Sequence, residues 1–304
     1  MESWRRSLPV FLAFGGPTII WLLVFFLIPL GIIWFYSVGE NVSLTEIEVT
    51  WTLSNYDRIF EPEILTLLWR SLWLAGITTV ISLVVAYPVA LVIATAEMKW
   101  KPWLLLIIIL PFWTNLLIRT YALLNILGSR GRVNDVLYYL WYWADTALGW
   151  IGLGWVLGER FAPVKFLGTE LGVVIGLVYV ALPFAILPIY SSLERMDKSF
   201  LEASMDLGAS QIRTFFTILV PLTTAGLATA AILTFIPSIG SFLTPDLLGR
   251  GQVDMIANVI ERQFKKANDW PFGSALSLML LYVTFIILAI RAWIDMSRSR
   301  ERRA

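Results

Sequence analysis

Apolar residues gather into six long runs, which are separated by shorter polar segments. A helix needs about 20 apolar residues to cross the hydrocarbon core of a membrane, and each run is long enough to do so. The pattern therefore predicts an all-α, polytopic membrane protein whose transmembrane domain covers residues 11–297. The six predicted spans lie near residues 11–38, 71–96, 103–127, 167–192, 222–243 and 273–297.

Composition agrees with a membrane protein and narrows its chemistry. Hydrophobic residues make up 58% of the 304 residues and charged residues only 15%, too few to cover a soluble globule. Cys and His are both absent, which excludes disulfides, thiolate or imidazole metal sites and Ser-His or Cys-His catalysis within the chain. No G-x-x-x-x-G-K-[ST] loop occurs either. We therefore expect a non-enzymatic chain with no catalytic residue, metal or cofactor of its own.

Charge distribution sets the predicted orientation. With the N-terminus inside, the cytoplasmic segments hold 12 basic and 8 acidic residues, and the external loops hold 10 basic and 14 acidic. The positive-inside rule favours this arrangement, with a cytoplasmic N-terminus at residues 1–10 and a basic cytoplasmic tail at 298–304. The first apolar run is too long for a signal peptide and lacks an A-x-A-like site, so we expect an uncleaved span.

Three external loops follow from this topology, at residues 39–70, 128–166 and 244–272. The second mixes Gly with Trp and Tyr, a composition typical of a segment that lies at the membrane interface. Its apolar stretch is short and rich in Gly for a seventh span. The third carries a polar middle, which we expect at the external mouth.

The cytoplasmic segment 194–221 has clear helix-capping signals. Ser199 lies three residues before Glu202, as in a capping box, which predicts a helix that begins at Phe200. Gly208 can adopt the left-handed conformation that ends a helix. Ser210 can then cap a second short helix that runs to about residue 219, before Pro221. From these signals alone, the segment could equally be an amphipathic loop without a special function.

The spacing of Glu202, Ala203, Gly208, Ile218 and Pro221 resembles the EAA loop of ABC importer permeases, and it lies between the fourth and fifth spans, as in that family. The resemblance implies that the first helix docks into a cleft of an ATPase subunit, with Glu202 and Asp206 as polar contacts on one helix face. The residues that it assigns to ATPase coupling are Glu202, Ala203, Ser204, Asp206, Gly208 and Ala209.

Three further stretches resemble the PotB-like polyamine permeases, namely Leu110–Leu124, Gly176–Ser210 and Asn258–Gly273. The resemblance implies a type I ABC importer permease fold and a pathway for spermidine or putrescine. It also implies a PotC-like second permease, a PotA-like ATPase dimer that holds ATP and Mg, and a PotD-like external binding protein. Membrane lipid is the remaining expected partner, and no nucleic acid is expected.

A polyamine pathway needs carboxylates at its entrance and aromatic faces inside, which attract cations by about 0.5–2 kcal/mol. Each candidate also has a plain alternative, since aromatic residues often anchor spans at the interface and external acids are often simply solvated. The candidate pathway residues are Trp113, Asn115, Tyr121 and Tyr179 in predicted spans, and Asp246, Asp254, Glu261 and Asp269 in the third external loop.

Arg119 is the only basic residue deep within a predicted span. Its insertion at a span centre costs roughly 2.5–3.5 kcal/mol, so it should face protein or water. We expect a structural pairing with a carboxylate or backbone carbonyls of this chain or of the second permease. Prolines interrupt five of the spans, which predicts kinked helices around a cavity.

Other function classes stay open at this stage. A type I permease for another small solute would carry the same coupling signals. An ion-coupled secondary transporter would need acidic residues near mid-membrane and inverted repeats, and neither is visible. A membrane-embedded hydrolase or transferase would need a convergent set of acids, bases or nucleophiles, which the chain lacks. A membrane scaffold without a pathway is the plainest alternative.

Overall fold

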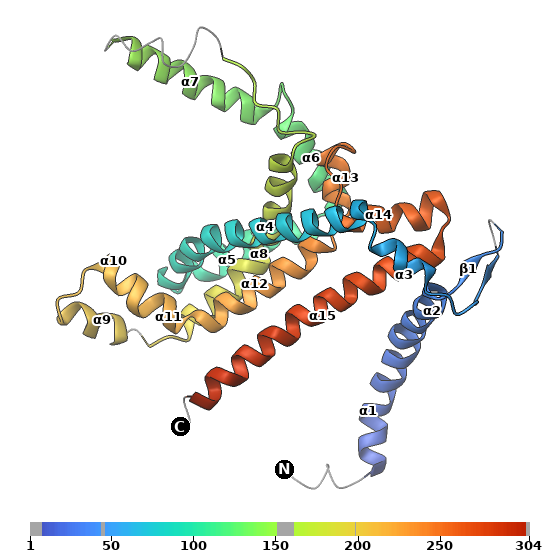
Figure 1. The fold of residues 1–304 in the computed structure, drawn as a ribbon. Coiled ribbons are helices and arrows are strands. Elements are labelled where there is room, and N and C mark those ends of the chain that lie inside the picture. The colour runs from blue at the N-terminus through green and yellow to red at the C-terminus, as the bar shows by residue number, and fades with distance from the viewer. Residues whose placement is uncertain (1–7, 44–45, 151–160, 198, 302–304) are drawn as a thin grey trace. The chain divides into compact units, whose positions relative to one another are not determined.

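The computed structural model describes residues 8–43, 46–150, 161–197 and 199–301. Helices dominate these residues (Figure 1), and the only strands among them are two of two residues each, so the predicted all-α class is confirmed. The chain divides into two compact units, Met1–Thr66 with Val259–Ala304 and Leu67–Asn258.

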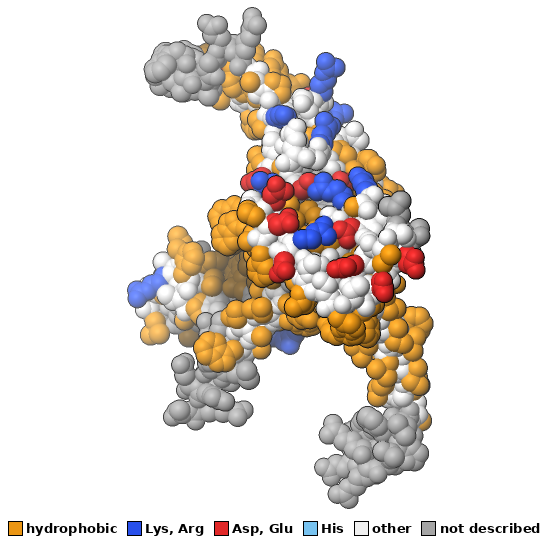
Figure 2. Space-filling view, turned by 45° about the vertical axis from the view of Figure 1, so that its right-hand side comes forward, with side chains coloured by type: hydrophobic (Ala, Val, Ile, Leu, Met, Phe, Trp, Pro, Cys, Tyr) orange, Lys and Arg blue, Asp and Glu red, His pale blue; other side chains and the backbone are white. Residues whose placement is uncertain are grey.

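The first unit contains the first predicted span as α1 (Leu8–Leu22), a π-helical turn η2 (Leu23–Leu27) and α2 (Ile28–Ser37). The N–H of Ile28 donates to Leu23 O, and Pro29, which has no N–H, follows at once. Large apolar side chains cover the visible surface of this segment (Figure 2). Such a surface is suited to lipid, as the pattern predicts.

The first unit continues with a short hairpin and ends with a long helix. Strands β1 (Glu40–Asn41) and β2 (Ile47–Glu48) pair antiparallel, and α3 (Ser54–Ile59) follows. Helix α15 (Trp270–Glu301), which packs against α2 and α3, comes after the π-helical turn η6 (Gln263–Ala267). The remaining element, α14 (Ile256–Arg262), joins the two units along the chain.

Three helices form the centre of the second unit: α4 (Pro62–Thr95), α8 (Glu170–Glu194) and α12 (Thr224–Ile239). Small residues allow α12 to approach α8 closely. A Cβ added to Gly226 would lie 2.5 Å from Ser192 Cβ and 2.9 Å from Pro188 O. The helix α13 (Leu243–Gly249) packs on another part of α8, where the buried Leu248 joins Val173 in a second apolar cluster.

The third predicted span is not one continuous helix. It consists of α5 (Lys101–Ile109), a 3-10 turn η3 (Leu110–Trp113) and α6 (Leu116–Leu127), with a bend of 97° between the α5–η3 segment and the helix that begins at Leu116. Pro111 removes an N–H donor, and Thr114 and Asn115 are extended. The sequence therefore indicated the apolar range correctly but not its break.

The fifth predicted span also has a bend before it. Helix α10 (Gln211–Thr214), the π-helical turn η5 (Phe215–Leu219) and α11 (Val220–Leu222) lead into α12 at 69°. The buried Thr223 occupies the bend, where its hydroxyl donates to Leu219 O at 2.8 Å and lies 2.9 Å from Tyr87 Oη. The side chain thus replaces part of the hydrogen bonding that the bend interrupts.

Within the described residues, four helical segments are long and apolar enough to cross a membrane, and the number rises to as many as six if each bent pair counts as one span. The described part of the second predicted external loop forms α7 (Arg132–Trp150), whose exposed aromatic side chains include Tyr139 and Trp143. Its predicted place at the membrane interface stays a prediction. Residues 151–160 of that loop lie outside the described residues.

The close contact at Gly226 predicts a local sensitivity to volume. Gly226→Ala should lower the thermal stability of the purified protein in detergent, since the added methyl group overpacks the α8–α12 contact by about 1–3 kcal/mol. Gly76→Ala in α4 is the matched control, because its Cβ would meet no atom within 4 Å. Equal melting temperatures for the two variants would contradict the packing described.

Candidate functional site

The segment that resembles the EAA loop begins with helix α9 (Ser199–Asp206). The Ser199 N–H donates to Asp197 Oδ1 at 2.9 Å, so Asp197 satisfies a free donor of the first turn. This backbone bond, together with a second from the Ser199 hydroxyl, lowers the pKa of the exposed Asp197 carboxyl. The predicted capping box of Ser199 and Glu202 is therefore wrong, because Ser199 already lies inside the helix and its hydroxyl bonds to Asp197.

Gly208 ends α9, as predicted, with φ at +84°. The Gly208 N–H donates to Met205 O at 2.9 Å and the Ala209 N–H donates to Ser204 O at 3.1 Å. This pair of bonds is the Schellman motif, which satisfies the last carbonyls of a helix. Glycine adopts such a positive φ without the steric cost that a side chain would bring.

The second short helix folds back against α9. Ser210 caps α10 by accepting from the Arg213 N–H at 3.3 Å, as predicted. Across the corner, the hydroxyl oxygens of Ser204 and Thr214 lie 3.0 Å apart, within hydrogen-bonding distance. The two helices and their glycine corner, visible at α9 and α10 in Figure 1, thus form one hydrogen-bonded block.

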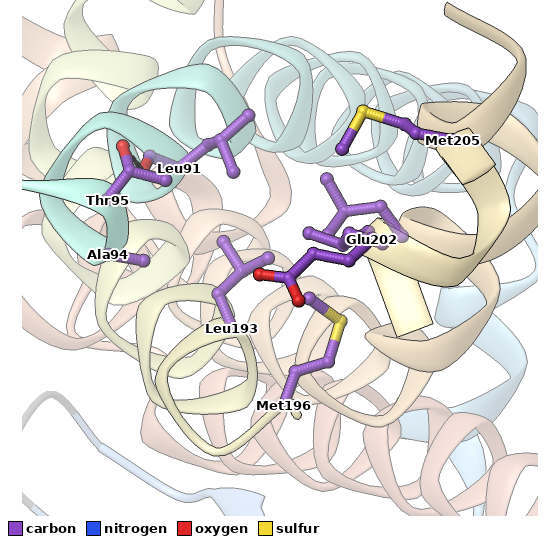
Figure 3. Close-up of a pocket in the computed structure, with 9 residues that line it drawn as sticks. Leu91, Ala94, Thr95, Leu193, Met196, Glu202 and Met205 are labelled. Atoms are coloured by element: carbon purple, nitrogen blue, oxygen red, sulfur yellow. Dashed lines mark hydrogen bonds between the residues drawn. The ribbon is translucent and has the colours of Figure 1, made fainter. Parts of the chain in front are cut away.

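A cavity of about 210 Å³ lies between part of this block and the ends of α4 and α8. The Glu202 carboxylate turns into it (Figure 3), among side chains that are almost all apolar. Among the described residues, Glu202 has no ion pair or side-chain hydrogen bond, while Asp206 is exposed and lies outside the lining. The lining residues are Leu91, Ala94, Thr95, Leu193, Met196, Leu201, Glu202, Met205 and Leu219.

Large apolar side chains project outward from the same block. Leu207 is 89% exposed, and Phe200, Ile212 and Phe216 are also more than half exposed. The coupling residues predicted from sequence are polar or small, and they do not include these four. Apolar residues inside an otherwise polar segment between two spans were the available signal, because an exposed apolar patch marks an interaction site.

The four predicted pathway residues of the spans all belong to the second unit, but at different elements. Trp113 ends η3 and is 77% exposed, and Tyr121 and Tyr179 are exposed on α6 and α8. Asn115 has a structural task, since its Oδ1 accepts from the Leu117 N–H at 2.8 Å and caps α6. The aromatic residues remain candidates, whereas Asn115 is explained by the break itself.

The external acids differ in how far they are already engaged. In the first unit, Asp269 Oδ2 accepts from Arg58 at 2.9 Å and Oδ1 accepts from the Phe272 N–H at 3.2 Å. Oδ1 thus caps the start of α15 and Oδ2 ties that start to α3, so Asp269 has a structural task, and its predicted entrance role stays a prediction. Glu261 pairs with Lys265 at 3.1 Å.

In the second unit, Asp246 is exposed in the first turn of α13 and Asp254 is half-buried. Asp254 also makes contacts with other residues. Over the residues that the structure describes, no group of three or more His, Cys, Asp or Glu side chains is placed to hold a metal ion. For all four external acids, the entrance role stays a prediction.

Arg119 lies on α6 with its guanidinium 5.7 Å from the centre of the Phe112 ring. Its Nε is buried and has no hydrogen-bond partner, and no carboxylate among the described residues pairs with it. Phe112 in turn packs edge-on against Phe184 of α8, with ring centres 4.8 Å apart. The predicted pairing is therefore not made within the described part of this chain.

Comparison with known proteins decides the family. A scan against protein-family models finds no match. The chain is 37% identical over 274 residues to the spermidine/putrescine transport system permease protein PotB of Haemophilus influenzae, covering 89% of this chain and 88% of the relative. It is 38% identical over 270 residues to the Escherichia coli PotB, covering 89% and 92%. The chain belongs to the PotB family of ABC-importer permeases.

Solved structures agree with the PotB-family assignment at the level of the fold. A bacterial ABC transporter involved in the import of alginate aligns with a TM-score of 0.66 and 17% identity, over 97% of this chain and 99% of that one. The type I ABC importer permease fold is thus confirmed. Like other PotB-family chains, this protein is a multi-pass inner-membrane permease subunit of an ABC importer.

The glycine corner of this PotB-family loop yields a prediction. Because the chain has no cysteine, the double variant Ser204→Cys/Thr214→Cys should form a disulfide across the corner on mild oxidation. Adding Gly208→Val should reduce the yield of this disulfide. A β-branched residue at this positive φ costs about 1–2 kcal/mol in backbone strain. Gly208→Asn, which tolerates that conformation, is the control.

Gel mobility before and after reduction measures the cross-link. An undiminished yield with Gly208→Val would show that the corner does not need a glycine.

Proposed function

We propose that this permease forms half of an ATP-driven pathway for spermidine and putrescine across the inner membrane. The observation that carries the proposal is the similarity over 89% of the chain to relatives whose names specify spermidine/putrescine transport. The exposed aromatic rings of Trp113, Tyr121 and Tyr179 suit multiply charged amines, since each face offers cation–π attraction of about 0.5–2 kcal/mol.

The proposed orientation places both termini and the segment 194–221 in the cytoplasm, on the basis of the positive-inside charge bias. The α9–α10 block would then meet an ATPase subunit of a PotA-like dimer, which binds ATP and Mg. Its outward apolar surface, formed by Phe200, Leu207, Ile212 and Phe216, supports this docking. Glu202 faces the cavity that α4 and α8 also line, so a displacement of the block would move this carboxylate relative to both helices.

Arg119 supports a second permease, PotC-like, as the other half of the pathway. A guanidinium whose Nε is buried without a partner is costly in a membrane, and a carboxylate or carbonyl from a neighbouring chain would relieve that cost. A PotD-like external binding protein would deliver the substrate. One of the solved structures with this fold is an alginate transporter in complex with a ligand-bound periplasmic protein. The exposed Asp246 is a candidate entrance residue.

The substrate is tested by measuring ATP hydrolysis in proteoliposomes. These contain the purified complex of this chain with its second permease, ATPase and binding protein. Spermidine or putrescine with the binding protein should raise ATP hydrolysis several-fold, to within the usual range of about 1–1,000 per second. Matched controls are the binding protein without amine and the amine without binding protein.

A complex that assembles and hydrolyses ATP but responds to neither amine would contradict the polyamine assignment. It would leave a type I permease for another small solute, with the ligand of the binding protein as the next question.

A further inference from the structure

A partly buried ion pair joins two helices at the start of the segment 194–221. Lys101 Nζ donates to both carboxylate oxygens of Glu194, at 2.8 Å each. The Lys101 side chain is only 11% exposed and that of Glu194 is 34% exposed. Lys101 is the first residue of α5, and Glu194 is the last residue of α8. Both charges therefore lie at a helix end.

The helix dipoles make this pair specific. Each residue carries the charge that its own helix end disfavours, since a helix N-terminus is partially positive and a C-terminus partially negative. The ion pair brings the Lys101 ammonium to the last residue of α8 and the Glu194 carboxylate to the first residue of α5. Near the other helix end, each charge is favoured by the dipole. These contributions are gained only while the two helix ends stay together.

Neighbouring charges do not compete for the pair. Lys99 bonds to Glu97 at 2.6 Å, and Arg195 turns back to donate to Ser191 Oγ at 2.7 Å. Separation would leave the Lys101 ammonium partly buried without an acceptor, which is costly. The pair is thus the charged contact between α5 and α8 at this level of the second unit.

Helices α8 and α5 continue into different segments of the chain. Immediately after Glu194 the chain enters the α9–α10 block, whereas α5 leads into η3 and the 97° break that precedes α6. Leu104, Leu105 and Ile108 hold α5 along the apolar cluster of α4 and α8. As a nine-residue helix that ends in a break, α5 can shift without carrying α6 as a rigid extension.

We propose that Lys101 and Glu194 are positioning residues, and that their ion pair transmits displacement of the segment 194–221 to α5 and the broken span. The inference rests on the proposed function, in that the displacement is the one the ATPase imposes. Displacement of the segment 194–221 would then reach α5 directly through this ion pair, as well as along α8.

The test follows movement at the break instead of transport. Since the chain has no cysteine, Thr114→Cys at the break introduces a single label site in this subunit. The probe is a water-soluble maleimide. It is applied to the assembled complex, in which the second permease and the ATPase have been made cysteine-free. Labelling is measured with and without a non-hydrolysable ATP analogue. The nucleotide should change the labelling rate by about threefold or more in the otherwise unchanged chain.

Lys101→Met should abolish this change while the complex still binds nucleotide. The exchange variant Lys101→Glu/Glu194→Lys should restore it, because opposite charges again pair between the same two positions. Lys99→Met is the matched control and should behave like the unchanged chain, because the Lys99–Glu97 pair is exposed, at 69% and 70%.

A nucleotide response that survives Lys101→Met, or that the exchange variant does not restore, would overturn the inference. If Lys101→Met does not assemble, the exchange variant decides alone: it must assemble and respond. A complex that cannot bind its ATPase would contradict the proposed function. A complex that binds it and hydrolyses ATP, yet shows no response in the unchanged chain, would contradict only the role of the pair.

Discussion

Every interruption of a helix in this chain has to be repaired by a local hydrogen bond, because lipid offers no substitute for a missing partner. Three prolines show how this is done. Pro29 and Pro221 each follow a π-helical turn that keeps the preceding N–H groups bonded. After Pro111 the helix stops, and the Asn115 side chain caps the next one. These repairs determine where the spans can bend.

The bends separate the second unit into rigid and adjustable parts. Helices α4, α8 and α12 pack through a continuous apolar cluster, and α12 approaches α8 closely at Gly226. The α9–α10 block is held by its own hydrogen bonds, and it meets that core through Leu201 beside the cavity around Glu202. A block with its own hydrogen bonds can move as a unit, which the proposed coupling to an ATPase requires.

Sequence could predict the apolar ranges, the helix-ending Gly208 and the capping Ser210, because each depends on residues close together in the chain. It could not predict the break at Thr114, since Pro88 and Pro183 sit inside helices that continue unbroken. The Lys101–Glu194 pair joins positions 93 residues apart, and no local pattern marks it. Likewise, the ion pair between Arg58 and Asp269 joins residues far apart in the sequence, so no local pattern predicts it.

The most direct test of the account is uptake of radiolabelled spermidine into proteoliposomes that contain the complete complex and enclosed ATP. The account predicts accumulation that requires both enclosed ATP and the external binding protein, and that persists when ionophores collapse all ion gradients. Uptake that proceeds without ATP and stops when an ion gradient is removed would contradict it, and would make the chain part of an ion-coupled transporter.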